Sequence, residues 1–254
     1  MVKHIVVREH NDSFVMTMVV TENKKINFLP LEQKLQKHFE HFGIVKNINK
    51  LGNNVIFGNV DENVCGKTEL EMEEFGIKYH VNNRSFLQVN DEIKTKIYHK
   101  IIELVGHEKN VIDAYSGAGL LSSILAKHAE NVYGVEIVKE ATENANNLKK
   151  INNLNNLTNI NGDCAKIIPE LANQLNGDFV IVVDPPRKGL DEKVVEAFIS
   201  SKPKKIVYLS CGPSTLARDL GMLKDFYDIK LVQPYNMFPQ TANVETLVEL
   251  ELKR

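Results

Sequence analysis

Strand and helix patterns alternate along the second half of the chain. Short apolar runs of the kind that form buried strands lie at 111–114, 132–136, 157–160, 179–184 and 206–209. Helical spacing of apolar residues follows these runs at 120–128, 139–152, 165–174, 191–200 and after 211. This alternation predicts a parallel sheet with helices on both faces, a doubly wound Rossmann-like α/β domain. Segments 229–234 and 245–252 are expected to be a final, hairpin-like pair of strands.

The first part of the chain has a different pattern, rich in strands with one helix. Alternating runs at 4–8 and 14–20 predict paired strands joined by a polar turn. Apolar residues at helical spacing predict a helix over 31–42, ended by Gly43. Cys65 is placed in a polar loop. Further strands are expected at 54–57, 69–75 and 77–81.

A linker-like segment at 82–90 separates the two patterns. Asn90 or Asp91 can cap a helix that runs to about residue 105 and belongs with the second pattern. We therefore expect a smaller α+β domain over residues 1–89 and the α/β domain over residues 90–254.

Composition narrows the class of protein. The 254 residues are 43% hydrophobic and 25% charged, as in ordinary globular proteins, and no apolar run reaches the ~18 residues of a membrane helix. Three cysteines without a C-x-x-C pair argue against a disulfide framework, a metal site or an iron–sulfur cluster, and favour a cytoplasmic protein. Because the net charge is −2, a nucleic-acid-binding surface would have to be local, and Arg187 with Lys188 and the lysines of 202–205 are candidates.

A glycine-rich turn follows the first strand of the α/β domain. The segment Asp113-Ala-Tyr-Ser-Gly-Ala-Gly119 lets a ligand approach the backbone, and Glu136 at the end of the next strand can bind a ribose hydroxyl pair. Ser122 occupies the third glycine position of the dinucleotide fingerprint. S-adenosylmethionine therefore fits this turn better than NAD does, which disfavours a nicotinamide dehydrogenase.

The segment Asp184-Pro-Pro-Arg-Lys-Gly189 ends another buried strand. Its two prolines stiffen the turn and present Asp184 at the carboxyl end of the sheet. The segment is similar to the Asp-Pro-Pro-aromatic motif of amino-group methyltransferases, but Arg187 replaces the aromatic residue that stacks on the methylated base. That replacement argues against methylation of an amine.

Cys211 stands at the carboxyl end of a strand and at the start of a helix, where ligands bind and thiolates are favoured. The alternative for a single cysteine is a small buried hydrophobic residue. Glu245, at the entrance to the last strand, would by itself be an ordinary surface acid. Around one pocket, however, a thiolate and a carboxylate make a nucleophile and a base.

Five segments in the same order resemble the RNA uracil-5 methyltransferase family. They are 83–90, 113–119, 184–189, 210–219 and 237–246. The last of them is closer to the 23S rRNA 5-methyluridine branch than to the tRNA branch. The OB-like (TRAM) domain that usually precedes the family's central domain is lacking, so the chain is expected to be a short form or a trimmed one.

The resemblance implies a role for each matching residue. Cys211 would add to C6 of uracil, which lets C5 take the methyl group of S-adenosylmethionine, and Glu245 would remove the C5 proton. Arg187 and Arg218 are candidates for substrate contacts. The residues implied for the cofactor and target-base pocket are Gln88, Tyr115, Gly117, Gly119, Glu136, Asp163 and Asp184.

The implied partner is RNA, most simply 23S rRNA with a single-stranded or flipped uridine, without a membrane or an obligate protein partner. Alternatives remain open at this stage. They are a tRNA uridine-54 C5 methyltransferase, a non-catalytic RNA-binding or assembly factor on the same fold, and an enzyme that methylates C5 of cytosine by the same thiol addition.

Overall fold

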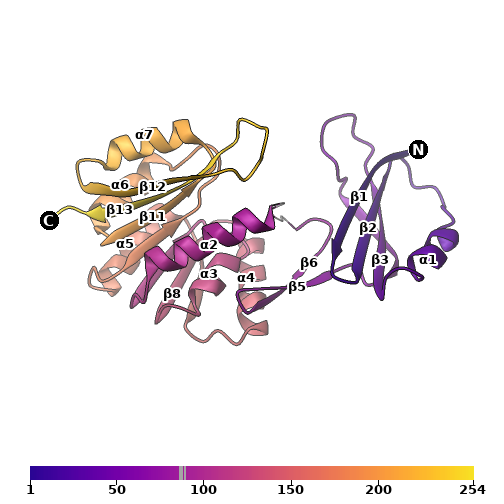
Figure 1. The fold of residues 1–254 in the computed structure, drawn as a ribbon, viewed down its shortest axis with the longest axis horizontal. Helices are drawn as coiled ribbons and strands as arrows, with labels where there is room; N and C mark the ends of the chain where they lie inside the picture. Colours follow the sequence, from indigo (N-terminus) through magenta and orange to yellow (C-terminus); the bar gives the residue numbers. More distant parts are fainter. Residues whose placement is uncertain (86–87, 89) are drawn as a thin grey trace. The chain divides into compact units, whose positions relative to one another are not determined.

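A computed structural model describes residues 1–85, 88 and 90–254 of the chain (Figure 1). The chain folds into two compact units. The first comprises Met1–Glu74 with Lys78–Leu87, and the second comprises Phe75–Ile77 with Gln88–Arg254. Three positions of the family-like segment 83–90, namely Phe86, Leu87 and Val89, lie outside the described residues.

The first unit is built on a mixed sheet with strand order β1-β2-β3-β4. As expected, the first two strands are an antiparallel pair. β2 pairs with β3 in parallel and β3 pairs with β4 antiparallel. The elements are β1 (Val2–His10), β2 (Ser13–Val20), α1 (Leu29–Leu35), β3 (His41–Ile48), β4 (Val60–Gly66) and the paired strands β5 (Leu70–Glu74) and β6 (Ile77–Val81).

The helix expected over 31–42 was wrong in its second half. α1 ends at Leu35, and 41–48 form strand β3. Gly43 does not cap a helix, because it lies inside β3, where a Cβ atom would be 2.1 Å from the carbonyl oxygen of Lys67. The apolar spacing had a different cause: Phe39 and Phe42 pack on the core cluster that includes Leu35. The spacing of apolar residues therefore indicated correctly that these rings pack in the core, but it did not indicate their backbone conformation.

The strand expected over 54–57 was also wrong. The strand lies at β4 instead, and Cys65 is part of it and not of a polar loop. The side chain of Asn49 donates to the carbonyl oxygens of Val55 and Ile56, at 2.7 and 2.9 Å. These bonds satisfy the backbone of 55–56 outside any ladder, so the segment forms a loop.

The second unit has the doubly wound α/β architecture that the alternating pattern predicted. Its sheet has the order β12-β13-β11-β10-β7-β8-β9. Five neighbouring strands of this sheet are parallel to one another, namely β11, β10, β7, β8 and β9. Strand β13 is antiparallel to both β11 and β12. The strands are β7 (Asn110–Ala114), β8 (Asn131–Glu136), β9 (Leu157–Asn161), β10 (Val180–Val183), β11 (Lys205–Ser210), β12 (Tyr227–Tyr235) and β13 (Glu245–Leu252).

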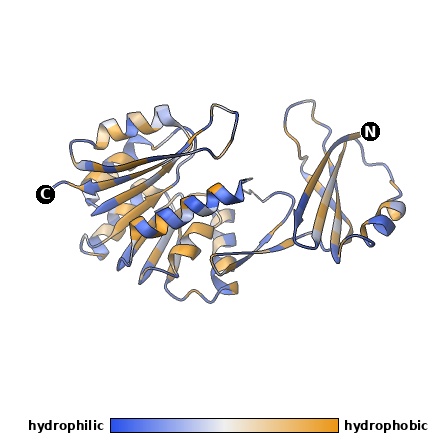
Figure 2. Ribbon diagram, in the orientation of Figure 1, coloured by the Kyte–Doolittle hydropathy of each residue, from blue (hydrophilic) through white to orange (hydrophobic). Residues whose placement is uncertain are grey.

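Helices cover both faces of this sheet (Figure 1). The helices are α2 (Asp91–Val105), α3 (Leu120–Leu125), α4 (Lys139–Ile151), α5 (Cys164–Gln174), α6 (Glu192–Ser201) and α7 (Pro213–Leu223). One core cluster joins α5, α6 and α7 to the strand residues Ile112, Ile181 and Tyr208. On the other face α2 contacts β10 and β11, and hydrophobic residues are interspersed among hydrophilic ones along this helix (Figure 2). Asn90 caps α2 by accepting a hydrogen bond from the backbone N–H of Ile93 at 3.2 Å.

The parallel strands therefore present their carboxyl ends along one edge of the sheet. β13 runs the opposite way, so its first residue lies at that same edge. In open α/β sheets this edge is where ligands bind.

Candidate active site

Three of the expected cofactor residues follow strand ends that are neighbours in the sheet. Val183 at the end of β10 pairs with Ala114 at the end of β7, which in turn pairs with Val135 of β8. The next residue along each strand is Asp184, Tyr115 and Glu136, respectively. The register therefore places a carboxylate, an aromatic ring and a second carboxylate side by side at the carboxyl edge.

The glycine-rich turn after β7 depends on left-handed backbone. Gly117 and Gly119 have φ of 54° and 83°, and Tyr115 adopts φ of 61°, which is uncommon for a bulky residue. A Cβ atom on Gly119 would lie 2.6 Å from that of Ala145 in α4. The glycine at 119 is therefore needed both for its conformation and for its contact with α4.

The side chain of Glu136 is held by backbone N–H groups of this turn and of the segment after β8. Its Oε2 accepts a hydrogen bond from Gly117 N–H at 3.0 Å, and its Oε1 accepts one from Val138 N–H at 2.8 Å. A carboxylate has further lone pairs, so Glu136 can still accept hydroxyl donors from a ligand. The turn fixes the direction of this side chain before any ligand arrives.

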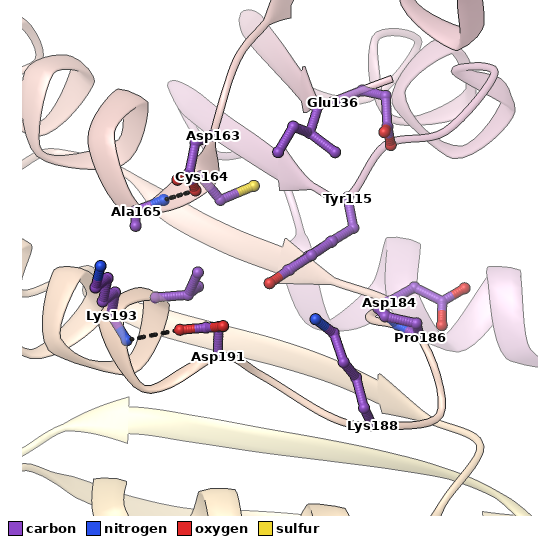
Figure 3. Close-up of a pocket in the computed structure, with 12 residues that line it drawn as sticks. Tyr115, Glu136, Asp163, Cys164, Ala165, Asp184, Pro186, Lys188, Asp191 and Lys193 are labelled. Atoms are coloured by element: carbon purple, nitrogen blue, oxygen red, sulfur yellow. Dashed lines mark hydrogen bonds between the residues drawn. The ribbon is translucent and has the colours of Figure 1, made fainter.

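A cavity of about 720 Å³ opens over these strand ends (Figure 3). Asp163 and Asp191 border it as the caps of α5 and α6, where they accept hydrogen bonds from Ala165 N–H and Lys193 N–H. Tyr115 and Lys188 extend toward the same space (Figure 3). The described residues that line the cavity are Tyr115, Glu136, Ile137, Asp163, Cys164, Ala165, Asp184, Pro186, Lys188, Asp191, Lys193 and Val194.

The cavity brings together most, but not all, of the expected cofactor residues. Tyr115, Glu136, Asp163 and Asp184 line it. Gln88, Gly117 and Gly119 are not among the described lining residues, although Gly117 acts on the site through its bond to Glu136. Sequence reasoning did not single out Asp191 and Lys193. The available signal was the start of a helix, because Asp191 directly precedes α6.

Acidic groups near the cavity have raised pKa values. Enclosure by the protein raises the pKa of Asp184 to about 7, and the charges of Glu245 and Asp113 add to the effect. Part of Asp184 is open to solvent, and water there moderates the shift. Complete burial raises the pKa of Asp113 to about 7 as well, against the hydrogen bond that it accepts from Ser122. A cationic ligand would relieve this accumulation of acids.

Cys211 and Glu245 occupy opposite register positions at the ends of two adjacent strands. Ser210 of β11 is the register partner of Thr246 of β13, and the strands are antiparallel. Cys211 follows the first of these residues and Glu245 precedes the second, so both lie at the carboxyl edge of the sheet. Glu245 is 5% exposed and Cys211 is half-buried.

Burial and the surrounding charges together shift the pKa of the Cys211 thiol. Burial raises its pKa, and the negative charges of Glu245 and Asp184 raise it further, whereas the positive charge of Arg187 lowers it. Burial also raises the pKa of Glu245, and Arg187 again opposes the shift. Thiol, carboxylate and guanidinium thus influence one another within one small region.

The two expected substrate arginines lie in different surroundings. Arg187 is exposed at the edge of the site. Arg218 in α7 instead binds the protein itself, with its guanidinium contacting the carboxylate of Asp219 and the carbonyl oxygens of Lys188 and Leu190. A substrate contact by Arg218 stays a prediction.

Lysines that were candidates for a basic surface are in part bound to acids. Lys204 pairs with Asp178 and Glu108, and Lys205 pairs with Glu249 at 2.9 Å. Across residues 1–85, 88 and 90–254 the structure has no cluster of His, Cys, Asp and Glu that could hold a metal ion, and no helix there is long and apolar enough to cross a membrane.

Comparisons with known proteins agree with this geometry. A family model described as tRNA (uracil-5-)-methyltransferase matches residues 13–253. A protein of Listeria innocua named as an uncharacterized RNA methyltransferase is 42% identical over 99% of this chain and 57% of its own length. One of Halalkalibacterium halodurans with the same kind of name is 39% identical over 99% of this chain and 56% of its own. The chain thus spans just over half the length of these relatives.

Solved structures extend the similarity to the fold. The tRNA (uracil-54, C5)-methyltransferase of Pyrococcus abyssi, solved with S-adenosyl-L-homocysteine, superposes with a TM-score of 0.80 at 29% identity, over 97% of this chain and 59% of that one. Trm5b of the same organism, at 16% identity and a TM-score of 0.62, shares the fold alone. The family match over nearly the whole chain, with the glycine-rich turn, Asp184, Cys211 and Glu245 along one sheet edge, makes this chain a member of the tRNA (uracil-5-)-methyltransferase family.

Proposed function

We propose that this chain carries out S-adenosylmethionine-dependent methylation of C5 of a uridine in RNA. The observation that carries the proposal is the pairing of Cys211 with Glu245 at the same sheet edge as an acid-rich, nucleoside-sized cavity. Because the chain spans just over half of its relatives, the activity is proposed for the matched region, and further parts of such proteins can contribute to it.

The cavity fits a nucleoside that carries a positive charge. Glu136 offers carboxylate oxygens to a ribose, and Asp163 lies where it can accept from a base. Asp184 supplies negative charge next to Cys211, which suits a sulfonium. The residues proposed to hold S-adenosylmethionine are Gln88, Tyr115, Gly117, Gly119, Glu136, Asp163 and Asp184. When bound, this cofactor supplies the methyl group that C5 accepts.

The two catalytic side chains would act in sequence on the base. C5 of uracil is a weak nucleophile until a group has added to C6. Cys211, after losing its proton, would form the bond to C6 and send electron density to C5. After C5 has been methylated, Glu245 would take the C5 proton, and the Cys211–C6 bond would break as the double bond forms again. The raised pKa of Glu245 suits a proton acceptor better than that of an ordinary surface carboxylate.

The target nucleotide has to leave any base stack to reach a half-buried thiol. We propose a uridine of 23S rRNA as the target, on the basis of the segment 237–246. Uridine 54 of tRNA is the second candidate, and the family description and the similarity to the Pyrococcus abyssi enzyme favour it.

A covalent-adduct assay tests the reaction class and the target together. The protein is incubated with S-adenosylmethionine and with 5-fluorouridine-substituted 23S rRNA or tRNA transcripts, then resolved on a denaturing gel. Fluorine at C5 cannot be removed as a proton, so a working enzyme stays bound to the RNA. We expect a shifted band that requires both the cofactor and Cys211, and the RNA that gives it identifies the target.

Three other outcomes would change the proposal. Tight RNA binding with no adduct and no turnover would support a non-catalytic RNA-binding factor. Nucleoside analysis that finds 5-methylcytidine in unsubstituted RNA would replace uridine by cytidine. Failure to bind S-adenosylhomocysteine would contradict the proposed cofactor.

A further inference from the structure

Helix α7 is bonded to the loop after β10 through consecutive residues of one turn. Asp219 is 0% exposed, and its Oδ2 accepts hydrogen bonds from Leu190 N–H at 2.8 Å and from the Tyr208 hydroxyl at 2.7 Å. Its Oδ1 accepts from Arg218, at 2.8 Å from Nε and 2.6 Å from Nη2. A buried carboxylate with this many donors is fully satisfied and well fixed.

Arg218 extends this network to the loop backbone. Its Nη2 lies 3.0 Å from the carbonyl oxygens of both Lys188 and Leu190. The Thr215 hydroxyl, one turn earlier in α7, lies 3.2 Å from the carbonyl oxygen of Arg187. Gly189 has φ of 76°, and a Cβ atom there would lie 2.6 Å from Asp219 Oδ2, so the loop packs directly on the pair. The loop at 187–190 is thus attached to α7 at Thr215, Arg218 and Asp219.

This attachment matters because the same loop carries Arg187, whose carbonyl oxygen lies against the residue that follows Cys211: a Cβ atom on Gly212 would be 3.3 Å from it. The charged groups that act on Cys211 are Glu245 from β13 and Asp184 and Arg187 from the segment after β10. Arg187 is the cation among them, and it is the one that favours the thiolate. Arg218 forms an ion pair with Asp219, which compensates its charge within α7.

We propose that Arg218 and Asp219 are a positioning pair that holds the 187–190 loop so that Arg187 stays beside the turn that carries Cys211. The pair acts through Arg187 and touches neither RNA nor cofactor. This inference rests on the proposed function, in which Cys211 is the nucleophile, but it concerns the reactivity of the thiol and can be measured without turnover.

The test is the pH profile of Cys211 alkylation by iodoacetamide, an uncharged reagent that Arg187 does not attract. Peptide mass spectrometry measures modification at Cys211 in the whole chain, without RNA or cofactor. Because the thiolate is the reacting form, Arg187→Ala should slow alkylation by about threefold below the thiol pKa and leave it unchanged at high pH. Arg218→Ala should slow it by a similar factor, and the double variant should be no slower than either.

Two controls separate positioning from general loosening. Lys224→Ala removes an exposed positive charge at the other end of α7 and should leave the Cys211 profile unchanged. Cys164, which is buried in the same unit, should react equally slowly in every variant. If Arg218→Ala exposes Cys164, then Thr215→Val is measured in its place. This variant removes a hydroxyl that bonds the carbonyl oxygens of both Arg187 and Gly212, and it should give a smaller slowing.

Several results would overturn the inference. One is a wild-type Cys211 profile in Arg218→Ala and Thr215→Val alongside a shifted profile in Arg187→Ala. Another is a double variant in which the slowing of Cys211 alkylation equals the product of the slowings in Arg218→Ala and Arg187→Ala. Such a product would mean that the two arginines act independently and not through a shared loop. A third is weaker RNA binding with a smaller salt dependence in Arg218→Ala and no change in alkylation, which would make Arg218 a phosphate contact. Failure of the methyltransferase assay alone would leave these measurements unaffected.

Discussion

The carboxyl edge of the second unit's sheet has two halves that are built in different ways. At β7, β8 and β9 the backbone largely determines the geometry of the site. Residues with left-handed backbone in the turn after β7 orient the Glu136 side chain and shape the cavity wall. At β11 and β13 the side chains are placed by strand register, and an antiparallel strand brings Glu245 opposite Cys211. Asp184 lies between the halves, directly after the central strand β10, and the negative charges of Glu245 and Asp113 both raise its pKa.

This difference predicts how the halves respond to substitution. A side chain at the end of a rigid strand can be removed while its neighbours stay in place. Substitutions of Cys211 or Glu245 should therefore lower turnover and leave the affinity for the cofactor unchanged. A change in the turn half should weaken cofactor binding and spare the thiol. The two effects should be separable in one protein.

The largest effect is expected for Cys211→Ala, which removes the only proposed nucleophile. Turnover should fall by more than about 10⁴-fold, while the affinity for S-adenosylhomocysteine, measured by calorimetry, should stay within about twofold of the wild type. Cys65→Ser is the matched control, because Cys65 lies in β4 of the first unit, and it should retain activity. Loss of cofactor binding in Cys211→Ala would show that the two halves are not independent.

Glu245→Gln should act on the second half of the reaction. Without the proton acceptor, turnover should fall by about 10²–10⁴-fold, and a Cys211–RNA adduct should accumulate on ordinary, unfluorinated RNA. The pKa of Cys211 should also fall, because a negative charge that raises it has been removed. Equal turnover in wild type and variant, with no adduct on a denaturing gel, would assign the base to another residue.

Glu136→Gln should have an intermediate effect, confined to the cofactor. Replacing a charged acceptor by a neutral one should weaken S-adenosylhomocysteine binding by about 10–100-fold, in line with the usual strength of charge-assisted hydrogen bonds. The control is Glu140→Gln, which removes the same charge from an exposed residue in the first turn of α4. This variant should bind S-adenosylhomocysteine with the affinity of the wild type. The alkylation rate of Cys211 should be the same in both. A slower rate in Glu136→Gln alone would contradict the separation of the halves.

The sequence predicted the second unit better than the first, for a physical reason. In the doubly wound sheet each of the five parallel strands is short and is followed by a helix, and β7, β10 and β11 are almost wholly buried, so local pattern and tertiary structure agree. In the first unit, Phe39 and Phe42 follow helical spacing, yet residues 41–48 form a strand. Pairing between β2 and β3 decides that conformation, and this long-range contact leaves no trace in periodicity.

The same distinction applies to the site. The glycine-rich turn, Asp184 and Cys211 were visible because each follows a buried strand directly. The bonds of Arg218 and Asp219 to the loop at 187–190 were not visible, since they join residues about thirty positions apart in the chain. Composition and spacing can identify an arginine, but only the fold shows whether its guanidinium faces solvent or binds a backbone carbonyl.

The smallest predicted effect concerns pH and the residue between the two halves. The pKa of Asp184 is raised to about 7, so its carboxyl is largely protonated below neutral pH and ionised above it. A cationic ligand is bound more tightly by the ionised form. The affinity for S-adenosylmethionine should therefore rise several-fold between about pH 6 and pH 8, less than the tenfold that a fully coupled charge would give, because Asp184 is partly open to water. S-adenosylhomocysteine lacks the sulfonium charge and should show a flatter profile. Asp184→Asn should remove the difference between the two ligands, and a difference that persists in this variant would place the sulfonium next to another acid, with Glu245 as the next to substitute.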